Sequence, residues 1–165
     1  MGRAETDDEF TRFVLETSRS LQRSAVLLAA DRDLADDLVQ TTYTKLFVAW
    51  PRVRRAGNPV AYAQRTLTNT FISQQRLRRN AELPVAELPE PTTELGREGG
   101  VDLLDVLRVL APLDRAVLTL RYWEDRSVAE TADALHLSET AVRTRSRRAL
   151  QRLRSHVPLI LEDHS

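Results

Sequence analysis

The stretch 127–154, SVAETADALHLSETAVRTRSRRALQRLR, constrains the fold of this chain more than any other part of the sequence. Ser127 and Glu130 stand at the spacing of a capping box, in which each side chain satisfies a backbone N–H of the other residue, so a short helix is predicted over residues 128–135. A two-residue turn and a second cap then precede a longer helix. A short helix, a tight turn and a longer helix together predict a helix-turn-helix.

The turn of this motif consists of His136 and Leu137, and Ser138 caps the second helix, which is predicted to end at about Arg154. Turns of this kind need a positive φ at the helix end, which glycine adopts without strain. Histidine tolerates it better than β-branched residues do, so we expect a small cost and an intact turn. Apolar residues at helical spacing are expected to form the buried seam: Ala129, Ala132, Leu135, Leu137, Val142, Ala149, Leu150 and Leu153.

The second helix of the motif is basic, with no carboxylate between Glu139 and its predicted end. In helix-turn-helix proteins the N-terminal half of the second helix enters the DNA major groove, where arginines bind bases or phosphates. A solvated, arginine-rich helix is the simpler interpretation, but the capping box, the turn and the apolar seam together favour DNA binding. The residues placed to reach DNA are Arg143, Thr144, Arg147 and Arg148.

Helical periodicity continues through the rest of the chain and predicts an all-α fold. Helices are expected at about 8–30, 34–50, 59–79, 101–110 and 114–123. Pro51 is expected to end the second of these and leave a basic loop at 51–58, and Asn58 and Pro59 form a helix-start signal. In the helix 114–123, one of Tyr122 and Trp123 is expected to point inward.

Prolines, glycines and glutamates mark residues 81–100 as a flexible acidic linker. The sequence therefore predicts two small helical domains, at 1–80 and 101–155, the second containing the helix-turn-helix. Residues 156–165 form a tail. Domains of this size have small cores and are marginally stable by themselves.

Charge is distributed unevenly, although Lys+Arg and Asp+Glu both number 24. Residues 1–80 hold 13 basic and 9 acidic side chains, whereas residues 81–100 hold 1 and 5. No carboxylate stands between Asp37 and Glu82, where eight basic residues occur. Together with the basic helix near the C-terminus, this pattern predicts two basic surfaces separated by an acidic stretch.

The helix predicted over 59–79 has two different faces. An apolar face is expected to point inward and consists of Val60, Ala63, Leu67 and Phe71. The other face carries no acid and consists of Tyr62, Arg65, Thr66, Asn69, Ser73 and Arg76. Cations can follow the phosphates of an unpaired nucleic-acid strand while Tyr62 stacks on a base, and an ordinary polar face is the alternative.

Several classes of function are disfavoured by what the sequence lacks. It contains no Cys, which excludes disulfides and thiolate metal sites. It has no apolar run near the ~20 residues of a membrane span and no secretory signal at its start, so a cytoplasmic protein is expected. Its histidines show no ligand spacing and it has no glycine-rich phosphate loop. We therefore expect no enzymatic activity, no cofactor, no metal and no small-molecule substrate.

Three segments resemble one known family. Residues 36–42 (DDLVQTT), followed by Phe47, resemble the polymerase-binding helix of extracytoplasmic-function (ECF) sigma factors, the smallest group of the sigma-70 family. Residues 61–69 (AYAQRTLTN) resemble the family's −10-element helix, and residues 113–132 resemble its second domain. The pattern is most similar to a subgroup common in high-GC actinobacteria. Ser146 departs from the family pattern, because an apolar residue is usual there.

The resemblance implies a sigma factor that directs core RNA polymerase to specific promoters and aids DNA melting in transcription initiation. It implies that the first domain binds the polymerase clamp and the −10 element, and that the second sits on the flap and reads the −35 element through the four residues given above. The residues implied for polymerase binding are Asp36, Asp37, Leu38, Gln40 and Thr41. Those implied for −10 binding and melting are Arg54, Arg55, Asn58, Tyr62, Arg65 and Asn69. An anti-sigma factor is a further candidate partner.

Two other classes of function remain open from the residues alone. A stand-alone helix-turn-helix transcriptional regulator would bind DNA tightly without polymerase, and it predicts an apolar dimer interface. A helical adaptor that binds only proteins would function without Arg143 and Arg147.

Overall fold

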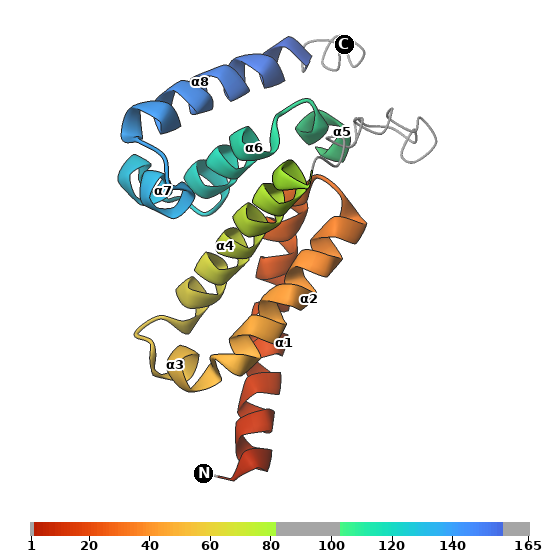
Figure 1. Cartoon of the computed structure of the whole chain (residues 1–165), viewed down its shortest axis with the longest axis vertical. Coiled ribbons are helices and arrows are strands. Elements are labelled where there is room, and N and C mark those ends of the chain that lie inside the picture. Colours follow the sequence, from red (N-terminus) through yellow and green to blue (C-terminus); the bar gives the residue numbers. More distant parts are fainter. Residues whose placement is uncertain (1, 82–102, 157–165) are drawn as a thin grey trace, which may run out of the picture. The chain divides into compact units, whose positions relative to one another are not determined.

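The computed structural model describes residues 2–81 and 103–156, and every regular element in these ranges is a helix (Figure 1). The prediction of an all-α fold is therefore confirmed. The chain forms two compact units, and the boundary between them falls after Phe71. The predicted linker beyond Ala81 and the predicted tail beyond His156 lie outside the described residues.

Within residues 2–81 and within residues 103–156, short connections join the helices. In chain order they are α1 (Arg3–Ala29), α2 (Arg32–Val48), α3 (Trp50–Arg55), α4 (Pro59–Asn80), α5 (Leu103–Arg108), α6 (Pro112–Leu118), the π-helix η1 (Thr119–Trp123), α7 (Val128–Leu135) and α8 (Glu139–His156).

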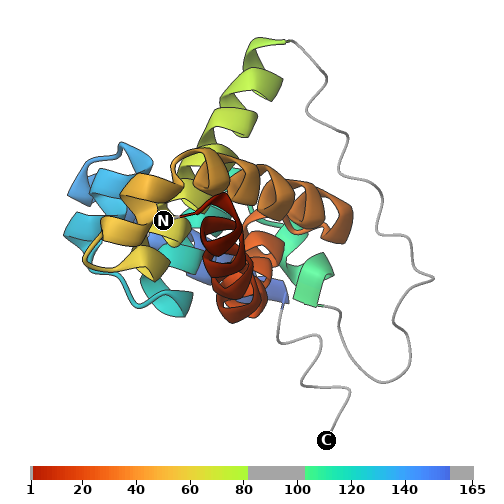
Figure 2. The same cartoon turned by 90° about the horizontal axis from the view of Figure 1, so that it is seen from below.

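The first unit is built on α1 and α2, which pack against each other; in Figure 2 the N-terminal part of α1 is seen nearly end-on, in dark red. The chain reverses between them at Ala30, which has a φ of 52°, and at Asp31, whose carboxylate accepts the backbone N–H of Leu34 at 2.9 Å. Asp31 is thus a helix cap, as the sequence predicted. The largest side chains with almost no exposure in this unit are Leu21, Leu28, Leu38, Leu46, Val53 and Leu67.

Two predictions about the first unit are wrong. Residues 51–55 belong to α3 and only 56–58 remain as a connection, because Pro51 lies in the first turn of that helix. A proline there loses no hydrogen bond, since the N–H groups of the first turn have no partner within the helix. Val60 is 43% exposed instead of buried, so the apolar face of α4 begins at Ala63.

The second unit contains the predicted helix-turn-helix, in which α8 packs against α5, α6 and α7 (Figure 1). The capping box is present: Glu130 N–H donates to Ser127 Oγ at 3.0 Å, and Ser127 N–H donates to the Glu130 carboxylate at 3.2 Å. The second bond lowers the pKa of Glu130, since it favours the ionised carboxylate. His136 has a φ of 57°, and Ser138 caps α8 through Ala141 N–H. The predicted turn and both caps are confirmed.

The core of the second unit differs from the prediction in two places. Ala129 is exposed, and the described part of α7 buries Thr131, Ala132 and Leu135 instead. Tyr122 and Trp123 are 59% and 51% exposed, although one of them was expected inside. Both residues lie at the end of the π-helix η1, which buries Thr119 and Leu120. A π-helix has a wider turn than an α-helix, so the residues after Leu120 do not face the core as the α-helical period predicted.

The second unit contains one buried arginine, Arg115, among its described residues. Arg115 donates from Nη1 to the carbonyl oxygen of Leu110 at 2.8 Å and thereby bridges the connection between α5 and α6. Burial, which is the larger cause, and the positive charge of Arg108 together lower the pKa of Arg115 to about 10. Arg115 therefore remains a cation at neutral pH.

Replacing His136 by glycine is expected to raise the free energy of unfolding by about 1 kcal/mol, because an L-residue in the left-handed region carries a steric cost that glycine lacks. Urea unfolding of the full chain followed by circular dichroism measures this change. The matched control is His156→Gly, since His156 is the last residue of α8 and should give little gain. A loss of stability on His136→Gly would show that the imidazole makes a contact worth more than the strain.

Candidate functional site

The exposed side of α8 is the first candidate surface. Arg143, Arg147 and Arg148 are exposed, and Thr144 is half-buried beside them. Val142 and Ala149 are buried at 0% and 1% exposure and hold the opposite side of the helix in the core. The structure thus places all four residues predicted to bind DNA where an approaching duplex can reach them.

One arginine of α8 lies differently. Arg145 Nη1 is 2.9 Å from Asp114 Oδ1 in α6, and the two side chains are 36% and 16% exposed. Arg145 therefore binds a carboxylate of α6, whereas Arg143, Arg147 and Arg148 on the same helix are exposed.

The second candidate surface lies on α3 and the first half of α4. Arg65 and Asn69 are exposed and Tyr62 is half-buried, and all three share one side of α4 at i, i+3 and i+7 spacing. Arg55 is exposed at the end of α3. No carboxylate lies on the described part of α4, so a surface of this composition can hold an anionic strand with an aromatic ring beside it.

Two residues predicted for this surface are engaged within the protein. Asn58 Oδ1 accepts the backbone N–H of Ala61 at 3.1 Å, so its oxygen serves as the cap of α4. Arg54 Nη2 lies 3.3 Å from Glu9 Oε2, which draws its charge toward α1. Both remain exposed at the surface.

The third candidate surface is on α2. Asp36, Asp37 and Gln40 are exposed, and Thr41 is half-buried. Leu38, which the sequence interpretation placed among the partner-binding residues, is 0% exposed and lies in the core between the helices. A side chain in that position supports the surface from beneath and has no area with which to contact a partner.

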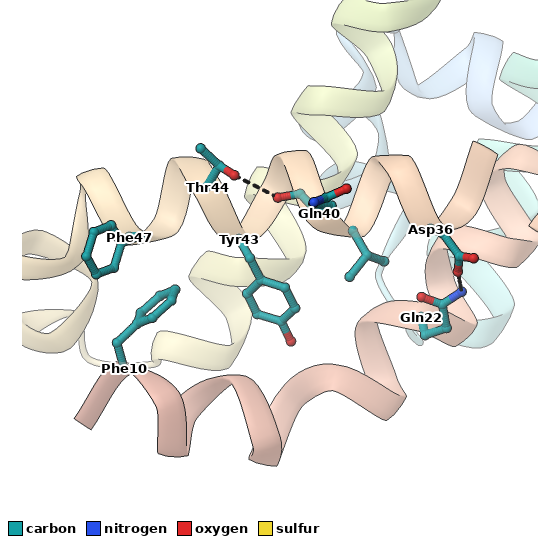
Figure 3. A pocket seen from close by; sticks show the side chains of 8 residues that line it. Phe10, Gln22, Asp36, Gln40, Tyr43, Thr44 and Phe47 are labelled. Carbon is teal, nitrogen blue, oxygen red and sulfur yellow. Dashed lines mark hydrogen bonds between the residues drawn. The ribbon is translucent and has the colours of Figure 1, made fainter. Parts of the chain in front are cut away.

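A groove of about 510 Å³ runs between α1 and α2 beside these residues (Figure 3). Its two ends differ in character. At one end Gln22 Nε2 donates to Asp36 Oδ1 at 2.7 Å, and at the other the rings of Phe10 and Phe47 meet edge-on with centroids 5.1 Å apart. Val39, Gln40, Tyr43 and Thr44 line the wall between the two ends.

The middle of the groove is held rigid by Tyr43. Its hydroxyl shares a hydrogen bond of 2.7 Å with Thr17 Oγ1 and donates to the carbonyl oxygen of Val14 at 3.3 Å. Burial raises the pKa of Tyr43, and the hydrogen bond with Thr17 only partly opposes this effect. The ring therefore stays neutral and presents an apolar wall.

Sequence reasoning missed the contribution of α1 to this groove. Neither Phe10 nor Gln22 was predicted as a site residue, because periodicity identifies which residues face a neighbouring helix but not which of them remain open at its edge. Phe47, 51% exposed, was identified only through the family resemblance.

The described ranges contain neither a candidate metal site nor a helix that could span a membrane. Residues 2–81 and 103–156 contain no group of three or more His, Asp or Glu side chains that could hold a metal ion. None of the helices in the same ranges is long and apolar enough to cross a membrane.

Two family models match this chain, one in each half. The model of sigma-70 region 2 matches residues 13–82, and the model of sigma-70, region 4 matches residues 100–153. The first match contains the α4 surface and every lining residue of the groove except Phe10, and the second contains α7 and all but the end of α8.

Individual proteins agree with this assignment. The RNA polymerase sigma-E factor of Streptomyces coelicolor is 38% identical over 152 residues, which cover 90% of this chain and 86% of that protein. The sigma-E factor of Streptomyces avermitilis is 36% identical over 90% of this chain and 85% of its own. The ECF RNA polymerase sigma factor SigX of Bacillus subtilis is 26% identical over 82% of this chain and 77% of its own.

A solved structure shares the fold. The sigma factor RpoE of Bartonella quintana, crystallised with the anti-sigma factor NepR, has a TM-score of 0.65 and 23% identity over 89% of this chain and 95% of that one. The two matched regions and the relatives that span most of the chain lead to one conclusion. The chain belongs to the sigma-70 family of RNA polymerase sigma factors, in its extracytoplasmic-function group.

Proposed function

We propose that this sigma factor binds core RNA polymerase, directs it to promoters with two separate elements, and helps to melt the DNA at the downstream one. The observation that carries the proposal is that each matched region has its own exposed basic helix face, on α4 and on α8. A stand-alone helix-turn-helix regulator needs only the second of these faces.

In this proposal α8 reads the −35 element. Arg143, Thr144, Arg147 and Arg148 lie in the exposed part of its first three turns, which is where a recognition helix meets base edges in the major groove. Arginine binds guanine through two parallel hydrogen bonds, so an exposed arginine on this face can carry base specificity.

The α4 surface meets the −10 element. Arg55 and Arg65 supply charge for phosphates, Asn69 supplies amide hydrogen bonds, and Tyr62 supplies a ring on which an unpaired base can stack. Arg54 and Asn58 belong to the same surface, with the Asn58 amide nitrogen as its available donor because its oxygen caps α4.

The groove between α1 and α2 is proposed to receive core polymerase, with Asp36, Asp37, Gln40 and Thr41 along its edge and Leu38 only as support. Its polar and aromatic ends suit an amphipathic helix of the clamp. The second domain is proposed to bind the flap. Since a structural relative was crystallised with an anti-sigma factor, such a protein is a further proposed partner.

The proposed division of labour follows the domains expected from the sequence: residues 1–80 for polymerase and the −10 element, 81–100 as the linker, 101–155 for the −35 element, and 156–165 as a tail. The role is that of a non-catalytic initiation factor, acting in the cytoplasm, where core polymerase transcribes.

The proposal is tested by transcription of fragmented genomic DNA with core RNA polymerase, with and without the protein, followed by mapping of the 5′ ends. New start sites that share two upstream elements at constant spacing are expected. Absence of new starts, together with site-specific DNA binding by the free protein, would instead establish a stand-alone regulator.

Arg65→Ala is expected to reduce open-complex formation about tenfold, the effect of losing one charged hydrogen bond, while recruitment to the promoter changes little. Permanganate reactivity of unpaired thymines measures melting, and band shifts of the holoenzyme measure recruitment. Arg19→Ala is the matched control, because Arg19 is an exposed arginine of α1 and is not among the residues predicted for this surface. Normal melting in the Arg65 variant would remove Arg65 from the −10 surface.

A further inference from the structure

We infer that Arg145 is a positioning residue: by binding Asp114 of α6 it sets the orientation of α8 for recognition of the −35 element, and it does not contact the DNA itself. This inference rests on the proposed −35 function of α8.

The geometry separates Arg145 from the other arginines of its helix. Its guanidinium is 2.9 Å from Asp114 Oδ1, 31 residues away in sequence, and the aspartate side chain is only 16% exposed. Arg143 and Arg147, two residues to either side, are exposed. Residues two apart on a helix point in widely different directions, so Arg145 cannot share the face of its two neighbours.

A second bond lies on the same side of α8. Arg152, seven residues after Arg145, donates from Nη1 to the carbonyl oxygen of Val109 at 3.4 Å. Positions seven apart lie almost above one another on a helix. The side of α8 next to the connection between α5 and α6 is therefore held at two points along its length.

Packing alone restrains α8 weakly. Within the described residues, the only fully buried side chains of α8 are Val142 and Ala149, both small. Between them, the buried hydroxyl of Ser146 has no hydrogen-bond partner among the described residues. Leu150 and Leu153 are only half-buried, so short side chains and an unsatisfied hydroxyl fix the rotation of the helix about its axis less firmly than large interlocking side chains would.

The ion pair between Arg145 and Asp114 is directional, so it restrains the rotation of α8 that the packed side chains restrain weakly. Arg145 is next to Ser146 in sequence, and its ion pair joins α8 to α6, one of the helices against which α8 packs. Because the pair is partly exposed, solvent weakens it, and its contribution to overall stability is expected to be small. Its effect is on orientation: rotation of α8 would break the pair and move Arg143, Arg147 and Arg148 together relative to the major groove.

The test uses holoenzyme assembled from core polymerase and the full chain, on a promoter found in the transcription experiment and on the same promoter with a scrambled −35 element. The ratio of the two affinities, measured at one salt concentration, reports −35 specificity. Wild-type protein must first show this ratio above one; if it does not, the proposed function of α8 fails, and not the inference about Arg145.

Asp114→Asn and Arg145→Gln are each expected to lower the ratio about fivefold, and the double variant to be no worse than either, since both changes remove one interaction. The matched cycle uses Arg143→Gln, an identical change on the same helix without this partner. Its effect should multiply with that of Asp114→Asn. Circular dichroism melts confirm that each variant is folded at the assay temperature.

The sign of the Asp114→Asn effect decides between the alternatives. If Arg145 binds a phosphate directly, Asp114→Asn releases the arginine, and the holoenzyme binds the promoter as tightly as wild type or more tightly. That result would overturn the inference. The inference is also overturned if both single variants leave the ratio of affinities unchanged. Exchanging the charges, Asp114→Arg with Arg145→Asp, should restore much of the ratio if Arg145 acts through orientation. The same exchange should restore nothing if Arg145 binds DNA, because an acid would then face the phosphates.

Discussion

Leu38→Ala is expected to lower the free energy of unfolding of the first unit by about 2–5 kcal/mol, because it removes a fully buried side chain and leaves a cavity between the helices. Urea unfolding of the full chain, followed by circular dichroism, measures this loss. The prediction bears directly on how the α2 surface works, since a leucine with no exposed area should influence polymerase binding only through folding.

Leu34→Ala is the matched control, because Leu34 lies on the same helix and is 36% exposed. It should cost less than about 1 kcal/mol, the range of partly exposed substitutions. A Leu38→Ala variant with unchanged stability but no binding to core polymerase would contradict the structure and return Leu38 to the interface.

Arg147→Ala is expected to cost about 1–3 kcal/mol of discrimination at one base pair of the −35 element, because an exposed arginine on this face can bind one base through two hydrogen bonds. The corresponding loss of preference is about fivefold to 150-fold. Initiation from a panel of promoters, each with one −35 base pair substituted, measures it: the variant should become indifferent to a single position.

Arg154→Ala is the control for charge, since Arg154 is exposed near the C-terminal end of the same helix. It should weaken initiation on all promoters of the panel to a similar, small extent. If Arg147→Ala behaves in the same uniform way, its side chain binds a phosphate and specificity comes from another residue of α8.

Local signals predicted the helix-turn-helix well. The capping box, the positive φ at His136 and the cap at Ser138 depend on residues only a few positions apart, and all of them are present. The exposure of Arg143, Arg147 and Arg148 followed from the same periodicity, because a charged side chain without a partner stays in water.

The errors have a different origin. Pro51 is compatible with both the end of one helix and the first turn of the next, and the contact of Val53 with the core selects the second. The orientation of Tyr122 and Trp123 depends on a π-helix, which changes the helical period and has no distinct signal in the sequence.

The sequence by itself determined the all-α class, the caps of α2, α4, α7 and α8, the basic faces of α4 and α8, and the family, because each depends on short-range spacing or on residue identity. Only the tertiary structure decided that Leu38 supports the surface of α2 from beneath, that α1 supplies Phe10 and Gln22 to the groove, and that Arg145 binds Asp114. These facts depend on which residues of distant segments meet, and a helical pattern specifies the side of a helix that is buried but not the atoms that it meets.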